Sequence, residues 1–260
     1  MNDVISLEDY LAKGGKLSSP ENANARYRGE IMRLMAVFVD SEMAGAAGFA
    51  DCINMAPGLK ERQIAARIVL EKFAHAQRVL TLMEQFGANT SRYVAQHPWA
   101  VRQDRNANLG TQRAEGTQAT GDMRLNVFHY PIQNWCDAVT MNTLMGRATV
   151  VQLDELRDCS YQPLADAMTE IVPVEARHAE LGRAGLEQLL NDDVAAVDAA
   201  QQAIDYWYPR VAATFGRIGS QRFEIYKKYN LRQHDNEALL GRWQDQIHAL
   251  ISDLNLHVPE

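Results

Sequence analysis

The sequence predicts an all-α protein built as one bundle of long antiparallel helices. Apolar residues recur every three or four positions over several long stretches, which is the spacing of one face of a helix. The alternation of apolar and polar residues that is typical of strands is nearly absent. Because the long stretches also lack heptad charge patterning, they favour a bundle over an extended coiled coil.

The chain begins with a polar segment at residues 1–20, which is expected to be a flexible N-terminal arm. Residues 21–260 are expected to form a single domain. The first long helix is predicted at about residues 22–49 and the second at about residues 59–86. A Pro-Gly turn signal separates the two.

Each of these two helices presents an inward face on which charged residues interrupt the apolar pattern. On the first helix this face comprises Ile31, Met35, Phe38, Glu42, Gly45 and Phe49. On the second helix it comprises Ile64, Ile68, then Glu71 or Lys72, and beyond them His75, Val79, Leu82 and Phe86. The glycine at position 87 follows the last apolar residue, as expected at a helix C-terminus.

Residues 88 to about 130 are polar and contain several glycines, so they are expected to form a long irregular segment that is functional or mobile. Four more helices are predicted beyond it: from near residue 131, from a break at residues 160–163 to about residue 190, at about 193–215 and at about 236–254. Pro173 lies inside the second of these, where it removes a backbone hydrogen bond and should kink the helix just before Glu175.

The composition argues against several classes of protein. The 260 residues are 47% hydrophobic and 23% charged, as in an ordinary globular domain, and the net charge of −7 argues against nucleic acid or an anionic membrane as a partner. The three cysteines form no C-x-x-C motif, so they indicate neither a disulfide framework nor a zinc site and favour a reducing cytoplasm. The N-terminus is unlike a signal peptide, and no apolar run is long enough to span a bilayer.

Four polar residues occupy positions where the helical spacing calls for apolar ones: Glu42, His75, Glu175 and His178. Glu175 and His178 form an E-x-x-H pair, whose carboxylate and imidazole lie one turn apart on the same helix face. Burying such groups without a partner is costly, and a metal ion held between helices is one suitable partner. Ferritin-like bundles build their di-metal sites from Glu residues and E-x-x-H pairs on facing helices.

Several ordered segments then carry a family resemblance. They are DSEMAG in the first helix, the His-containing turn of the second, FHYPIQNWCDA, SYQPLADAMTEIVPVEARHAELG, AIDYWYPRVAATFG and LNLHVPE. Over roughly residues 25–260 the chain resembles the catalytic subunits of phenylacetyl-coenzyme A epoxidase, a multicomponent monooxygenase of phenylacetate degradation. The resemblance implies a ferritin-like bundle with additional C-terminal helices, a carboxylate-bridged di-iron site, dioxygen chemistry on an aryl-coenzyme A thioester, and a ferritin-like partner subunit.

The resemblance places Glu42, His75, Glu175 and His178 at metal-ligand positions. Two further positions depart from the family pattern. Lys72 stands where the family has a Glu three residues before the His of the second helix. A glycine at position 146 stands where the third helix of the family supplies an Asp.

These departures leave the number of metal ions open. Two divalent ions bring four positive charges and Lys72 adds a fifth. The two remaining carboxylates compensate two of these, which leaves about three positive charges uncompensated. One ion, as iron, zinc or manganese, would leave about one positive charge uncompensated, or none if Lys72 is neutral. With no metal, Lys72 would be the counter-ion of Glu42 and Glu175. Alternatively, Glu71 replaces the missing carboxylate from its position four residues before His75, and Asn142 offers a carbonyl oxygen.

Two main functions follow as hypotheses. The first is an oxygenase-type oxidoreductase that acts on an aromatic acyl-coenzyme A or a similar small molecule. Its metal would be held by the four ligand candidates, with Lys72 and Glu71 as further site residues. It would take electrons from a separate reductase, because the chain carries no flavin or iron–sulfur motif. The second is a non-catalytic scaffold paralogue in which a Lys72–carboxylate salt bridge replaces the metal and which assembles with a partner or with itself. An altered activity at a one-metal site is a third reading.

Overall fold

The computed structural model describes residues 5–105, 122–192 and 196–259. The long helices in this part of the chain are α2 (Ala25–Met55), α3 (Leu59–Gln85), α6 (Trp135–Arg157), α7 (Gln162–Asp192), α8 (Ala196–Ala212) and α10 (Asn236–Asp253). The short elements are α1 (Leu7–Ala12), α4 (Thr90–Gln96), α5 (Trp99–Gln103), η2 (Asn126–His129), η3 (Ala213–Phe215) and α9 (Gln221–Lys228). The only β-type pairing among the described residues is an isolated bridge between Leu17 and Tyr161, so the all-α prediction is confirmed.

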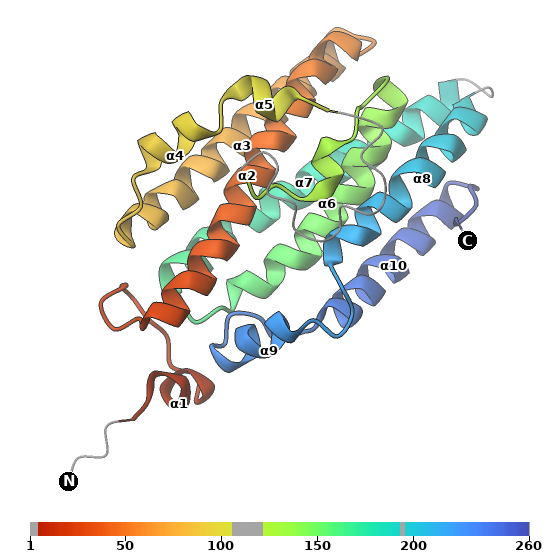
Figure 1. Cartoon of the computed structure of the whole chain (residues 1–260). Coiled ribbons are helices and arrows are strands. Elements are labelled where there is room, and N and C mark those ends of the chain that lie inside the picture. The colour runs from red at the N-terminus through yellow and green to blue at the C-terminus, as the bar shows by residue number, and fades with distance from the viewer. Residues whose placement is uncertain (1–4, 106–121, 193–195, 260) are drawn as a thin grey trace.

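Four long helices form the central bundle, in which α2 lies along α3 and α6 lies along α7 (Figure 1). The α3–α7 contact closes the bundle on one side, and α8 and α10 pack against the outer face of α6. This arrangement is the predicted ferritin-like bundle with additional C-terminal helices. Within the described residues, no helix combines the length and the apolar character that crossing a membrane requires.

Local signals set the ends of these helices close to where the periodicity predicts them. Helix α2 begins after Asn24, whose side chain accepts a hydrogen bond from a backbone N–H of the first turn, and Asn134 and Asp235 cap α6 and α10 in the same way. Helix α3 is followed by Gly87, which has a φ of +87°. Helix α7 runs as a single element through Pro173, where the sequence predicts a kink.

The core consists of two large apolar clusters. One fills the space between α2, α3 and α7 and includes Ile31, Met35 and Met168. The other joins α6 to α8 and α10 through Trp207 and Trp243, both fully buried. The charged site residues described below lie between helices of the first cluster.

Two segments differ from the sequence-based expectation. The described part of the expected N-terminal arm contains α1 and buries Leu11 and Leu17 against the bundle. The segment predicted to be irregular contains α4, α5 and η2, while residues 106–121, the middle of this segment, lie outside the described residues. A buried ion pair holds this connection on α2, since Arg102 Nη2 lies 2.9 Å from Asp40 Oδ1.

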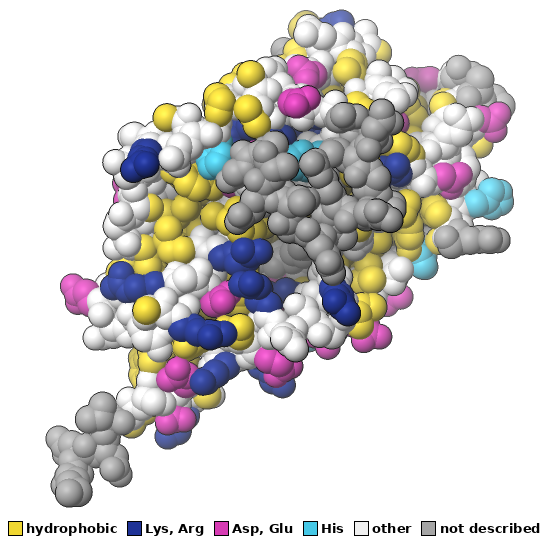
Figure 2. All heavy atoms as spheres, viewed as in Figure 1, with side chains coloured by type: hydrophobic (Ala, Val, Ile, Leu, Met, Phe, Trp, Pro, Cys, Tyr) yellow, Lys and Arg dark blue, Asp and Glu magenta, His cyan; other side chains and the backbone are white. Residues whose placement is uncertain are grey.

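One face of the molecule is rich in basic side chains although the net charge of the chain is −7. Figure 2 shows Lys and Arg side chains gathered over the first half of α2 and towards α9. These two helices carry exposed Arg26, Arg33, Lys227 and Lys228. An anion that approaches from this side therefore meets positive charge.

Candidate functional site

Three helices bring the predicted site residues together in the interior of the bundle. Glu42 comes from α2, Lys72 and His75 from α3, and Glu175 and His178 from α7. All five are buried, with exposed fractions between 1% and 7%. The inward position on α3 that the sequence left open between residues 71 and 72 is thus occupied by the lysine.

Lys72 forms a salt bridge with both glutamates. Its Nζ donates to Glu42 Oε1 at 2.9 Å and to Glu175 Oε2 at 3.0 Å. Burial alone would lower the pKa of Lys72, but the charges of Glu175 and Glu42 outweigh it and raise the pKa. Burial likewise favours a raised pKa for Glu175, yet the Lys72 charge holds the pKa of this carboxyl well below its usual range.

The lysine reaches this position because a glycine on α2 leaves room for its stem. A Cβ added at Gly45 would lie 3.2 Å from Lys72 Cδ, which is tighter than an ordinary contact. The side chain therefore runs inward along α2 instead of extending to solvent as surface lysines do.

His75 lies between the same two carboxylates. Its Nδ1 is 3.1 Å from Glu42 Oε2 and 3.0 Å from Glu175 Oε1. Burial would lower the pKa of His75, but its hydrogen bonds to Glu175 and Glu42 raise the pKa to about 9. At neutral pH the metal-free cluster therefore contains two cations, Lys72 and His75, and two anions, Glu42 and Glu175, and it is neutral overall.

His178 is oriented by a carboxylate on its outer side. Its Nε2 lies 2.6 Å from Glu71 Oε2, and Glu71 also accepts a hydrogen bond of 2.6 Å from Arg177. Because an ionised carboxylate can only accept, Nε2 carries the proton, and in the neutral ring Nδ1 keeps its lone pair. That Nδ1 lies 3.5 Å from Glu175 Oε1 and has no hydrogen-bond partner among the described residues, although it is buried.

The donor set fits one metal ion. Glu42, His75 and Glu175 each offer a ligand atom, and these atoms lie within 4.8 Å of one another. Ligand atoms about 2.1 Å from a shared ion are at most about 4.2 Å apart, so small shifts suffice. His178 is not part of this three-residue group, but its buried Nδ1 lies 3.5 Å from Glu175 Oε1, and its far nitrogen contacts a carboxylate, Glu71, as is usual for a metal-bound histidine.

The donor set does not fit two divalent ions. Even with Glu71 counted, three carboxylates face four metal charges and the charge of Lys72, which leaves about two positive charges uncompensated. A side chain at position 146 would be crowded, because a Cβ on Gly146 would lie 2.8 Å from the Cβ of Ala179 on α7. Asn142 is also engaged elsewhere, since its Nδ2 donates to the backbone oxygen of His178 at 2.7 Å.

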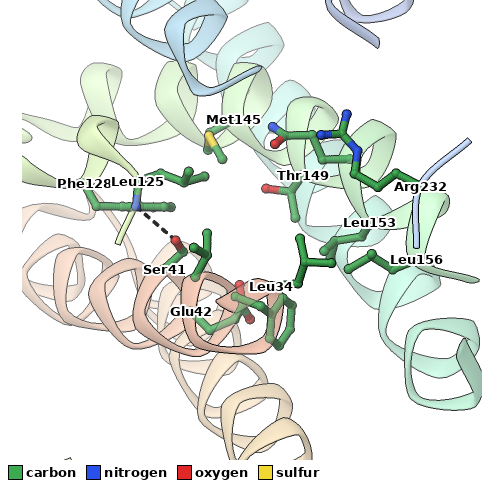
Figure 3. A pocket seen from close by; sticks show the side chains of 13 residues that line it. Leu34, Ser41, Glu42, Leu125, Phe128, Met145, Thr149, Leu153, Leu156 and Arg232 are labelled. Atoms are coloured by element: carbon green, nitrogen blue, oxygen red, sulfur yellow. Dashed lines mark hydrogen bonds between the residues drawn. The ribbon is translucent and has the colours of Figure 1, made fainter. Parts of the chain in front are cut away.

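An apolar pocket of about 120 Å³ opens beside this cluster, and Glu42 forms part of its wall (Figure 3). It is enclosed by α2, α6, the segment around η2 and the linker between α9 and α10. Its other lining residues are Leu34, Val37, Phe38, Ser41, Leu125, Phe128, Met145, Thr149, Gln152, Leu153, Leu156 and Arg232. Ser41 anchors the η2 segment by accepting a 3.1 Å hydrogen bond from the Leu125 N–H.

Sequence reasoning did not identify this pocket or Arg232. The linker that carries Arg232 lies far from the site helices in the chain, and no motif marks it. Only the α2 wall of the pocket could have been found from the sequence. Its residues Leu34, Phe38 and Glu42 recur at four-residue intervals and so share one helix face.

Comparison with known proteins agrees with the geometry. A family model described as "Phenylacetic acid catabolic protein" matches residues 15–260. The chain is also similar to one of the subunits of 1,2-phenylacetyl-CoA epoxidase from Escherichia coli (strain K12). The two are 23% identical over 266 residues, which cover 100% of this chain and 78% of that protein.

Proposed function

The chain belongs to the phenylacetic acid catabolic protein family, and from this membership we propose that it is an oxygenase-type oxidoreductase acting on an aromatic acyl thioester or a similar small molecule. The observation that carries the proposal is the position of Glu42. This residue belongs to the candidate ligand group and also to the wall of the apolar pocket. A substrate in the pocket would therefore lie directly against the metal site.

Each residue of the cluster has a role in this proposal. Glu42, His75, Glu175 and His178 would hold one ion, with iron as the metal that suits the reaction class. Bound iron would supply the activation of dioxygen. Glu71 keeps the proton on the outer nitrogen of His178, so that the inner nitrogen stays available.

A single ion leaves a small excess of positive charge. With His75 neutral, one divalent ion and Lys72 bring three positive charges, and Glu42 and Glu175 bring two negative ones. Glu71, which pairs with Arg177 and His178, lies on the outer side of the site. The leucine and phenylalanine side chains of the pocket exclude water from the reacting end. Electrons would come from a separate reductase, and the fact that the relative is one component of a larger enzyme supports assembly with other proteins.

Metal content tests the proposal. Protein produced with iron, manganese and zinc available should contain about one ion per chain by plasma mass spectrometry. His178→Ala and Glu175→Gln should lose the ion, while Arg78→Ala, which removes only an exposed ion pair with Glu170, should keep it. Iron-loaded protein with a chemical reductant should consume dioxygen when phenylacetyl-CoA is added. Absence of metal from the wild type under all three supplies would contradict the proposal.

A second function is favoured by a different observation, the salt bridge of Lys72 to both carboxylates. In this second proposal the chain is a metal-free scaffold protein of the same family, and Lys72 stands permanently in place of the ion. The wild type would then contain no metal, and Lys72→Glu would gain metal by restoring the family carboxylate. Metal in the wild type excludes this alternative.

A further inference from the structure

The outer end of the apolar pocket carries a guanidinium group. Arg232 reaches the pocket from the linker between α9 and α10 (Figure 3). Its nitrogens donate to Asn236 Oδ1 at 3.1 Å and to the backbone oxygen of His234 at 3.3 Å, both of which are neutral. No carboxylate in the described part of the chain forms a salt bridge with Arg232, and partial burial lowers its pKa. The guanidinium is thus partly desolvated, and the charges of Glu155 and Asp235 act on its pKa from nearby without an ion pair.

The linker that carries Arg232 is held firmly on α6. Glu155, a buried residue of α6, accepts hydrogen bonds of 2.7 Å from the backbone N–H groups of Gln233 and His234. It also contacts the imidazole of His234 at 2.7 Å. Leu231, on the other side of the arginine, is fully buried. Because both neighbours are fixed, the guanidinium is pre-organised at the pocket mouth.

The pocket therefore has different chemistry on different sides. Buried Glu42 lies on one side of the pocket and the more exposed Arg232 on another, and apolar side chains such as Phe38, Phe128 and Leu153 form much of the remaining wall. Its volume of about 120 Å³ is close to that of engineered cavities of roughly 150 Å³ that hold benzene. A ring-sized apolar body fits such a space. An attached anion is attracted to Arg232 and kept away from Glu42.

We propose that Arg232 binds an anionic oxygen group of the substrate and so directs the apolar body of that substrate towards Glu42. The anion is either the carboxylate of a free aryl acid or a phosphate on the carrier of an acyl thioester. The basic side chains around α2 and α9 support the approach of such a ligand (Figure 2). This proposal rests on the proposed function, in that it takes the pocket as the substrate site.

Equilibrium binding to metal-free protein tests it without any need for turnover. The probes are phenylacetate, its neutral analogue phenylacetamide, and phenylacetyl-CoA, each titrated by calorimetry in the presence of a chelator. A charged hydrogen bond at the mouth should favour the acid over the amide by about tenfold. Arg232→Gln should abolish this preference and leave phenylacetamide binding unchanged, which also shows that the variant is folded.

Two further variants sharpen the test. Arg232→Lys keeps the charge and should retain part of the preference. Arg78→Gln, which loses an exposed pair with Glu170 away from α2 and α9, should bind all three probes as the wild type does. Loss of the acid preference in Arg232→Gln identifies the anion as a carboxylate. In the other outcome, the wild type binds the acid and the amide equally well, and Arg232→Gln weakens the binding of phenylacetyl-CoA about tenfold. This outcome identifies the anion as a carrier phosphate.

The proposal is overturned if Arg232→Gln changes the affinity for neither anionic probe, or if no probe binds the wild type. These outcomes are separate from failure of the proposed function. A chain that contains no metal but shows the arginine-dependent preference would refute the metal site and leave the anion site standing.

Discussion

Replacing Lys72 with methionine removes one of the two cations that neutralise the two buried glutamates and keeps a side chain of similar length. The ligand atoms of Glu42, His75 and Glu175 lie within 4.8 Å of one another. Two negative charges at this separation repel each other by about 3.5 kcal/mol at an effective dielectric constant of about 20. Breaking a buried ion pair from one side typically costs about 3–5 kcal/mol. In metal-free protein, Lys72→Met should therefore be destabilised by roughly 3–5 kcal/mol.

A divalent ion should reverse this loss, because it supplies the missing positive charge. At 100 times its dissociation constant, a ligand that binds only the folded state adds about 2.7 kcal/mol. Denaturant titrations of the wild type and Lys72→Met, each with a chelator or with added Mn²⁺, would measure both effects. Lys60→Met, which changes an exposed lysine on the same helix, is the matched control.

The reasoning would be refuted if Lys72→Met and the wild type unfolded with the same free energy in the chelator. It would also be refuted if added metal stabilised the wild type more than the variant. The first result would mean that Lys72 does not compensate the two carboxylates, and the second that the ammonium group does not compete with the ion.

Three other predictions concern stability. In the presence of a chelator, the free energy of unfolding of the wild type should fall by about 3 kcal/mol as the pH rises from about 6.5 through about 9, because only the folded state keeps His75 protonated over this range. Denaturant titrations of His75→Gln should show a weaker dependence of this free energy on pH. Gly146→Ala should destabilise the protein by about 1–3 kcal/mol through overpacking against α7, whereas Gly241→Ala, with no atom within 4 Å of the new Cβ, should not destabilise it. Equal melting temperatures of the two variants would contradict this prediction. Asp40→Asn should cost roughly 3–5 kcal/mol by leaving the fully buried Arg102 without its carboxylate, and a loss below about 1 kcal/mol would show that the pair is solvated.

The long helices could be predicted from the sequence because their apolar spacing is sustained over many turns. The predicted second helix, at about residues 59–86, agrees with α3 to within one residue, and the last predicted helix agrees equally well with α10. The short helices α1, α4, α5 and α9 were not predicted. Helices of this length are marginal in isolation and form here through contacts with the bundle, which no local pattern records.

The site could be predicted only in part for a similar reason. Residues Glu42, His75, Glu175 and His178 interrupt apolar faces, so periodicity alone placed them inside. Whether Glu71 or Lys72 faces inward depends on the rotation of α3, since adjacent residues on a helix point in different directions. The position of the buried Nδ1 of His178 and the mouth of the pocket depend on three-dimensional contacts between distant segments, which the sequence does not reveal.

The charge balance within the cluster also determines whether the chain can fold before any metal binds. A bundle that buried four carboxylates would depend on captured cations to close, so its folding and its metal supply would be tied together. Here Lys72 and His75 match Glu42 and Glu175, and the chain brings its own counter-charges into the interior. The helices of a newly synthesised chain can therefore close without a captured metal ion. Under the proposed function, metal loading is a later exchange in which the incoming ion displaces a proton from the folded protein.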